Sequence, residues 1–255
     1  MQSSFLRLLS VIGFVFVCNS SNAQNIDIVG LKLGMTVAEA KAALLAYRVD
    51  PAIQEQRQYF TYSDGVNHNL KTEDFVTSIG ATRQADSNDN FSVFFSPGPK
   101  GGRVVAVIRT VASPNNPPVR SKYRDALIKK YGPPTTEGIS TIQWDFPAGK
   151  IQCIAGPVGT YAPTQPSILK KIYQANIGSR DAPFHHRNVQ SLSDCSSYLT
   201  YAMPSGDSSL VTQATAVMVD VGGTAEGELA ANEWVAGLAE AARKAQASQG
   251  AVPDI

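Results

Sequence analysis

Cysteine, histidine and excess charge are all scarce in this chain. Its 255 residues include 3 cysteines and 3 histidines, and 22 basic against 21 acidic side chains give a formal net charge of +1. No run of Lys or Arg exceeds two residues. Nucleic-acid binding requires a concentrated basic surface, and this balance provides none. We therefore expect no nucleic-acid partner.

Recognisable catalytic and metal-binding motifs are also absent. The sequence contains no GxSxG, HExxH, GxGxxG or P-loop pattern. A metal at His185-His186 would need a third ligand such as His68 or Asp194, and nothing in the sequence requires one. We expect no cofactor and no metal, and we favour a non-enzymatic role. A hydrolase that uses dispersed carboxylates remains an alternative.

The segment Asp86 to Asn90, DSNDN, alternates Asp and Asn as a calcium loop does at its start. Phe91 stands where such a loop needs glycine, and Pro97 stands where it needs glutamate. This excludes an EF-hand loop, and we expect an ordinary polar loop here.

The first 23 residues have the pattern of an export signal. Arg7 precedes an apolar run at residues 8–18, and Ser21 and Ala23 fit cleavage between Ala23 and Gln24. The run is too short to span a bilayer core of roughly 30 Å. We expect a periplasmic or secreted protein without a membrane span after cleavage. An uncleaved anchor and lipidation at Cys18 are the alternatives.

Cleavage would remove Arg7 and Cys18, leaving 21 basic residues, 21 acidic residues and two cysteines. Cys153 and Cys195 lie in no CxxC motif and have no histidine at ligand spacing. Exported proteins commonly join such a pair, and a loop of this length contributes about 3 to 4 kcal/mol. We predict a disulfide between them.

Capping and turn signals divide the first half into a helix and a hairpin. Thr36 and Glu39 fit a capping box at the start of a helix that ends before Asp50-Pro51. Residues 91–95 and 105–111 alternate as two strands around a Pro/Gly loop. We expect the loop 96–103 to be exposed, with Lys100 and Arg103 as candidate partner contacts beside Arg109. A plain solvated turn is the alternative.

The second half follows the segment SPNNPP at 113–118. A helix is expected up to Tyr131, because Gly132 and Pro133 stop it, and residues 142–146 alternate as a strand. Residues 197–221 indicate a strand pair, and an Ala-rich helix is expected at 225–247. Its predicted buried face contains Leu229, Val235, Leu238 and Ala242.

Grouped helices and antiparallel hairpins favour the α+β class. We predict a first α+β unit at 24–113, a second at 114–247 with the C-terminal helix, and a loose tail at 248–255.

Two segments, GMTVAEAKAALLAYR (34–48) and LIKKYGPPTTEGISTIQWDF (127–146), resemble small bacterial envelope proteins of the BamE/SmpA type. The matching residues are Gly34, Met35, Thr36, Leu127, Gly132, Pro133, Trp144 and Phe146. The resemblance implies a compact unit of two helices and three strands, and an association with outer-membrane barrel assembly. This unit type is also similar to that of secreted inhibitors that grip enzymes.

The two segments lie much farther apart here than in that family. A hairpin-rich insertion within one unit and two units in tandem are the alternatives, and a hairpin after each helix favours the tandem. The expected function is protein–protein contact, with an envelope protein as partner. A secreted inhibitor or a small-ligand module is the alternative.

Overall fold

The computed structural model describes residues 26–50, 52–84, 88–99, 101–113, 115–146, 197–204 and 209–248. Several predictions concern residues outside these ranges and stay predictions: the cleavage site at Ala23 and Gln24, Cys18, Lys100, the pair Cys153 and Cys195, and His185-His186. Among the described helices, none is long and apolar enough to cross a membrane.

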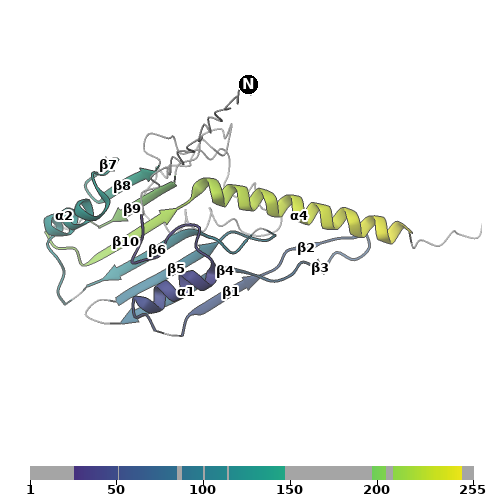
Figure 1. Cartoon of the computed structure of the whole chain (residues 1–255), viewed down its shortest axis with the longest axis horizontal. Helices are drawn as coiled ribbons and strands as arrows, with labels where there is room; N and C mark the ends of the chain where they lie inside the picture. The colour runs from purple at the N-terminus through teal and green to yellow at the C-terminus, as the bar shows by residue number, and fades with distance from the viewer. Residues whose placement is uncertain are drawn as a thin grey trace, which may run out of the picture.

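An eight-stranded antiparallel sheet with three described helices confirms the predicted α+β class (Figure 1). The strand order is β1-β4-β5-β6-β10-β9-β8-β7, and a short arm pairs β2 with β3. The strands are β1 (Gln54–Gln58), β2 (Thr61–Tyr62), β3 (Leu70–Lys71), β4 (Phe75–Gln84), β5 (Asn88–Phe95), β6 (Val104–Ala112), β7 (Thr136–Glu137), β8 (Thr141–Phe146), β9 (Ser197–Ala202) and β10 (Gln213–Val219).

Helix α1 (Val37–Ala46) begins with the predicted capping box. The Glu39 N–H donates to Thr36 Oγ1 at 3.2 Å, and the Thr36 N–H donates to Glu39 Oε2 at 2.7 Å. Ala40 and Leu44 are fully buried, one helical turn apart, and belong to the main core. Apolar residues four positions apart therefore determine which side of α1 packs against the sheet.

Helix α2 (Arg120–Tyr131) ends at Gly132, whose φ of 83° lies in the left-handed region that glycine favours. The indole N–H of Trp144 donates to the Gly132 carbonyl at 2.9 Å. The Trp144 ring also packs against Tyr131, with centroids 5.3 Å apart. The KYGPP and WDF segments thus lie in direct contact.

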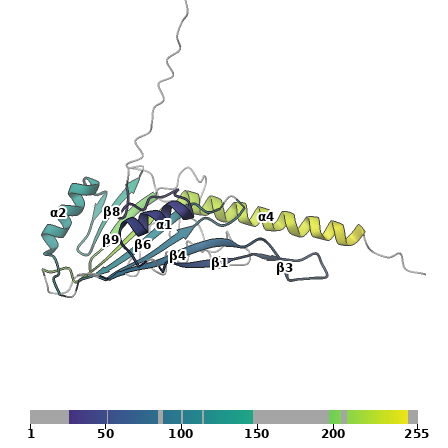
Figure 2. The ribbon, with the colours of Figure 1, turned by 60° about the horizontal axis from the view of Figure 1, so that its bottom comes forward.

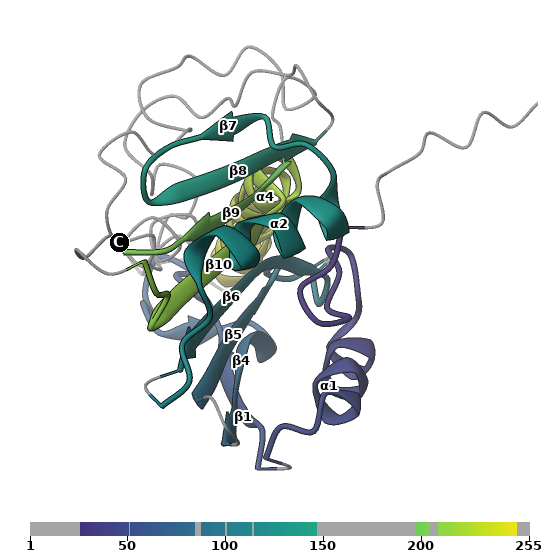
Figure 3. The ribbon, with the colours of Figure 1, turned by 90° about the vertical axis from the view of Figure 1, so that its left-hand side faces the viewer.

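Helices α1 and α2 lie on the same side of the sheet (Figure 3). Side chains of alternate strand residues point to this helix-covered face and share one core with Leu44 and Leu127. The shared core includes Ile79, Phe91, Val93, Val107, Ala216, Met218, Leu199, Tyr201, Ile142 and Trp144.

The two halves of the sheet repeat one connection pattern. Read from each edge to the centre, the strands run β1-β4-β5-β6 and β7-β8-β9-β10, and β6 pairs with β10 in the middle. One helix precedes each set of strands. Each helix's N-cap residue also bridges a residue shortly before the last strand of its own half: Thr36 with Arg103, and Val119 with Leu210.

Helix α4 (Val221–Ser248) projects from the sheet, and the β2–β3 arm extends along the same direction (Figures 1 and 2). It begins four residues earlier than expected, so Gly222 and Gly223 belong to its first turn. Leu229 is 37% exposed, which contradicts its predicted place on the buried face. The buried residues of α4 are Val221, Thr224, Ala225, Glu228, Ala231 and Val235.

Two further predictions need correction. Residues 88–90 are not a polar loop, because they form the start of β5. The Asp89 side chain is fully buried there. Strands β1 and β4, which occupy the polar region before β5, were not predicted.

Candidate functional site

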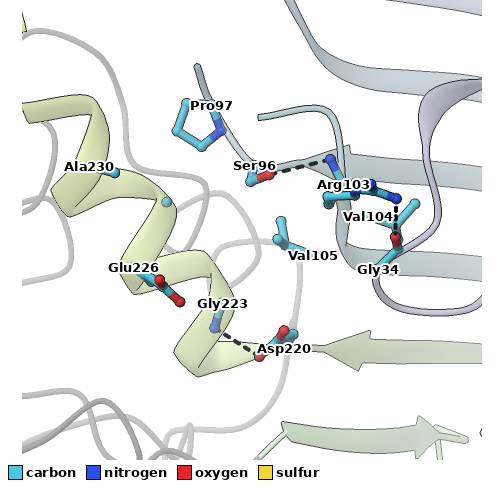
Figure 4. Close-up of a pocket in the computed structure, with 11 residues that line it drawn as sticks. Gly34, Ser96, Pro97, Arg103, Val104, Val105, Asp220, Gly223, Glu226 and Ala230 are labelled. Atoms are coloured by element: carbon cyan, nitrogen blue, oxygen red, sulfur yellow. Dashed lines mark hydrogen bonds between the residues drawn. The ribbon is translucent and has the colours of Figure 1, made fainter. Parts of the chain in front are cut away.

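A cavity of about 250 Å³ opens where the β5–β6 loop meets the first half of α4 (Figure 4). The turn before α1 closes one side of it. Glycines and small apolar residues form much of the wall, and four polar or charged side chains lie among them. The lining residues are Gly34, Ser96, Pro97, Arg103, Val104, Val105, Asp220, Gly223, Glu226, Gly227 and Ala230.

Backbone pairing holds the hairpin side of the cavity in place. The Gly34 N–H donates to the Val104 carbonyl at 2.8 Å, and the Val104 N–H donates to the Met35 carbonyl at 2.7 Å. Gly34 has a φ of 80°, a conformation that disfavours any residue with a Cβ. The glycine of the GMT segment is therefore explained by this tight turn, which places α1 beside the start of β6.

Arg103 stands at the edge of the cavity and is exposed. Its Nη1 donates to the Gly34 carbonyl at 3.3 Å, and its backbone N–H donates to Ser96 Oγ at 3.3 Å. The contact with Gly34 restrains a long side chain that would otherwise be mobile, and the contact with Ser96 holds the Arg103 backbone. The Arg103 charge also contributes to the lowered pKa of Glu39, after the larger effect of the two hydrogen bonds from Thr36.

Asp220 fixes the helix side of the cavity. It sits between β10 and α4, and its Oδ1 accepts a hydrogen bond from the Gly223 N–H at 2.9 Å. The Ser197 hydroxyl donates to the same oxygen at 3.4 Å. This is the arrangement of a helix N-cap, which satisfies one of the free N–H groups of the first turn.

Gly227 allows α4 to approach the hairpin closely. A Cβ added at this position would lie 3.1 Å from Ser96 Cβ and 3.3 Å from Pro97 Cδ. These separations are tighter than ordinary van der Waals contact. The absence of a side chain at position 227 therefore sets the width of the cavity.

Charges of both signs line the cavity, with the Arg103 guanidinium turned to the Gly34 carbonyl. Figure 4 shows Asp220 and Glu226 on the α4 side and Arg103 on the hairpin side. Glu226 is exposed, and no described residue forms a hydrogen bond or ion pair with it. Its carboxylate is therefore available to a ligand, whereas the Asp220 carboxylate is already engaged.

The lining contains no histidine, cysteine or lysine, so within the described residues it offers no activated nucleophile and no histidine base. Among the described residues, no group of three His, Cys, Asp or Glu side chains could hold a metal ion. The cavity is also smaller than most sites for drug-sized ligands, which occupy about 300 to 1,000 Å³. Its chemistry is suited to binding a small charged group.

The structure brings together only part of the predicted contact loop. Arg103 and Pro99 are exposed, but Ser96, Pro97 and Gly98 are buried, so the expectation of a fully exposed loop is corrected. The buried residues pack in the region where the hairpin meets α4. Arg109 does not lie beside Arg103, because its side chain points to the helix-covered face.

On that face Arg109 joins a buried polar cluster. Its Nη2 donates to Asp89 Oδ2 at 2.6 Å and to the Tyr47 hydroxyl at 2.7 Å. The Tyr47 hydroxyl donates to the same Asp89 oxygen at 2.8 Å. Burial lowers the pKa of Arg109, but the hydrogen bond and charge of Asp89 more than offset this, so its pKa is raised.

No protein-family profile, curated protein or solved structure matches this chain. Asp220 and Glu226 were not predicted as part of a site. Asp220 directly follows an apolar strand and lies one residue before Gly222-Gly223, a pattern that indicates a strand end as readily as a helix cap. An aspartate before a helix is a recognisable N-cap signal once the helix start is placed correctly.

Proposed function

We propose that this protein is an exported, non-enzymatic binding protein that contacts a partner in the bacterial envelope. In this proposal a lysine or arginine side chain of the partner enters the cavity between the β5–β6 loop and α4. Export rests on the signal-like pattern of residues 1–23. Binding rests on the cavity.

The observation that carries the proposal is the unpaired Glu226 carboxylate at a cavity with room for one side chain. Protein interfaces obtain much of their affinity from a few anchors that fill such pockets. Two carboxylates against one guanidinium give the lining a net negative charge, and the Arg103 guanidinium is directed to Gly34. A cationic anchor therefore complements the cavity.

We further propose that the chain consists of two BamE/inhibitor-like units in tandem. The mirrored strand order and the equivalent bridges at Thr36–Arg103 and Val119–Leu210 support this reading. The contact between Trp144 and Gly132 joins two matching residues of the second segment, 127–146. A tandem of such units is consistent with a role in binding another protein. That role includes inhibition of the bound protein.

A small-ligand module is the second candidate, and the opposite charges of Arg103 and Glu226 favour it. A zwitterion with an ammonium and a carboxylate would match both walls. A thermal-shift screen with free amino acids distinguishes the two candidates. Stabilisation by an amino acid that is lost in both Arg103→Gln and Glu226→Gln would favour this second function.

The partner is tested by crosslinking in intact cells followed by mass spectrometry, comparing Glu226→Gln with Glu233→Gln. Both glutamates are exposed on α4, but only Glu226 lines the cavity. We expect an envelope protein to be captured by the wild type and by Glu233→Gln, with a loss of about tenfold for Glu226→Gln, as for a hydrogen bond to a charged group. Equal capture by all three proteins would contradict the proposal.

A further inference from the structure

The eight-stranded sheet ends in two edge strands that differ in length, and β1 is the longer one (Figure 1). Strand β7 has two residues, and its Glu137 is paired with Arg124 of α2. Strand β1 has five residues, of which the first four are exposed. Apart from its ladder to β4, β1 makes no backbone-to-backbone hydrogen bond with any described residue. Such an edge presents free N–H and C=O groups that can pair with another strand.

The side chains of β1 form a symmetric pattern about Gln56. Glu55 precedes this residue, Arg57 follows it, and a glutamine stands at each end of the strand. Glu55 lies opposite Ile79 of β4, which belongs to the core beneath the helices. Glu55 and Arg57 therefore point to the helix-covered face, and the glutamines point to the other face. The register shift of this ladder leaves its extra residue, Thr77, on β4, so β1 itself is a regular strand.

This pattern is complementary to itself in one arrangement. When two copies of β1 run antiparallel with Gln56 opposite Gln56, Glu55 of each copy lies opposite Arg57 of the other. Gln54 then lies opposite Gln58, where the amides can both donate and accept. A parallel pairing in register, or an antiparallel pairing shifted by two residues, would instead place like charges opposite each other.

The two charged side chains are accessible to a second strand. The Arg57 side chain is 51% exposed, and its contacts with Glu55 Oε2 and with the Asp74 carbonyl are long, at 3.4 Å each. Lys41 of α1 pairs with the other oxygen of the Glu55 carboxylate and restrains it on the helix-covered face. An arginine from a second copy would therefore meet a carboxylate that is already held in place.

We propose that the protein forms a symmetric dimer in which two β1 strands join the sheets of two copies edge to edge. Both copies use the same strand, as a two-fold axis requires. Charges on an edge strand normally prevent pairing with other strands. Here they oppose other partners and other registers but attract a second copy in this one. Five residues per copy form less than a standard interface of about 1,600 Å², so we expect a dissociation constant that is micromolar or weaker.

Charge reversal tests the pairing by sedimentation velocity of the full chain over a range of concentrations. Glu55→Arg and Arg57→Glu each place like charges opposite each other in their own dimers, whereas an equal mixture of the two variants restores opposite charges at both pairs. We expect each variant alone to dimerise about tenfold more weakly than the wild type, and the mixture to recover wild-type association. Glu233→Arg, the same change at an exposed position of α4, is the control and should dimerise normally. Circular dichroism confirms that each variant is folded.

Oxidative crosslinking tests the register. Gln56→Cys places two thiols opposite each other at the two-fold axis, within the reach of a disulfide. In Gln54→Cys the two new thiols are separated by four residues along the strands, or about 14 Å, which is too far. We expect a disulfide-linked dimer for Gln56→Cys that exceeds the background of Gln54→Cys and the wild type.

Four results would overturn the proposal. A wild type that is monomeric at ~1 mM would leave the β1 edge to a strand of another protein. A dimer that neither charge reversal weakens, or a mixture that does not recover association, would show that β1 does not pair with itself. Equal crosslinking at positions 54 and 56 would exclude the register. No residue of β1 lines the cavity, so Glu226→Gln should dimerise as the wild type does, and loss of its dimer would place the contact at the cavity instead.

Discussion

The Asp89 carboxylate and the Arg109 guanidinium form an ion pair at 2.6 Å inside the protein, with no exposed surface on the Asp89 side chain. The pair joins β5 to β6 beneath Tyr47, the C-cap residue of α1. Removing one partner of such a pair leaves an uncompensated buried charge, which costs far more than the loss of a surface pair.

Asp89→Ala is therefore expected to lower the free energy of unfolding by about 3 kcal/mol. Urea unfolding monitored by circular dichroism measures this change. Asp125→Ala is the control, because the Asp125 side chain is 71% exposed, and its change should stay within about 0.5 kcal/mol. The double variant Asp89→Ala/Arg109→Met should recover part of the loss. If Asp89→Ala and Asp125→Ala had the same free energy of unfolding, the buried ion pair would not stabilise the fold.

Gly227 and Gly237 of α4 are expected to respond oppositely to alanine. At Gly237 an added Cβ meets no atom within 4 Å, so Gly237→Ala should stabilise the protein by about 0.5 to 1 kcal/mol through helix propensity. At Gly227 the same gain is offset by the clash with Ser96 and Pro97. Thermal unfolding of the two variants checks this, and a similar rise in Tm for both would show that α4 does not pack closely on the hairpin.

Buried tyrosines predict alkaline sensitivity. Burial raises the pKa of Tyr123 and of Tyr131 to about 12, above the value of about 10 for an unfolded chain. Their contribution to stability is therefore complete below pH of about 10 and is lost as the pH rises toward 12. Unfolding free energies measured across this range should fall with pH. The fall should be smaller in Tyr123→Phe/Tyr131→Phe, and an unchanged slope would argue against this burial.

The capping box predicts an acid effect at the start of α1. Hydrogen bonds from the Thr36 backbone and side chain lower the pKa of Glu39, with a smaller contribution from Arg103. A lowered pKa gives a contribution that is present above the unfolded-state value of about 4.3 and is lost as the pH falls below it. Carboxyl titration by NMR should show the Glu39 pKa moving up in Thr36→Ala. No movement would mean that the hydroxyl contact is absent in solution.

Local signals predicted much of this fold. Thr36 and Glu39 marked the start of α1, Gly132 marked the end of α2, and alternating residues marked β5, β6 and β8. These features depend on neighbours in sequence, so a single sequence contains them.

The remaining features depend on partners far away in the sequence. In the sequence alone, Asp89 has the features of a loop residue. Strand pairing places Arg109 opposite Phe91, and from there its guanidinium reaches the Asp89 carboxylate. The cavity needs Gly34, Arg103 and Glu226, which no sequence spacing connects. Leu229 illustrates the same limit, because the face of α4 that is buried is set by the hairpin and the β2–β3 arm rather than by hydrophobicity alone.

Site-specific photo-crosslinking is the most direct test of the central claim that the Glu226 cavity receives a partner. A diazirine amino acid placed at Ala230, which lines the cavity, is compared with one at Ala236, which is exposed farther along α4. Our account predicts a discrete crosslinked envelope protein at position 230, weakened by Glu226→Gln, and little product at position 236. The same products at both positions, or none at position 230, would contradict it.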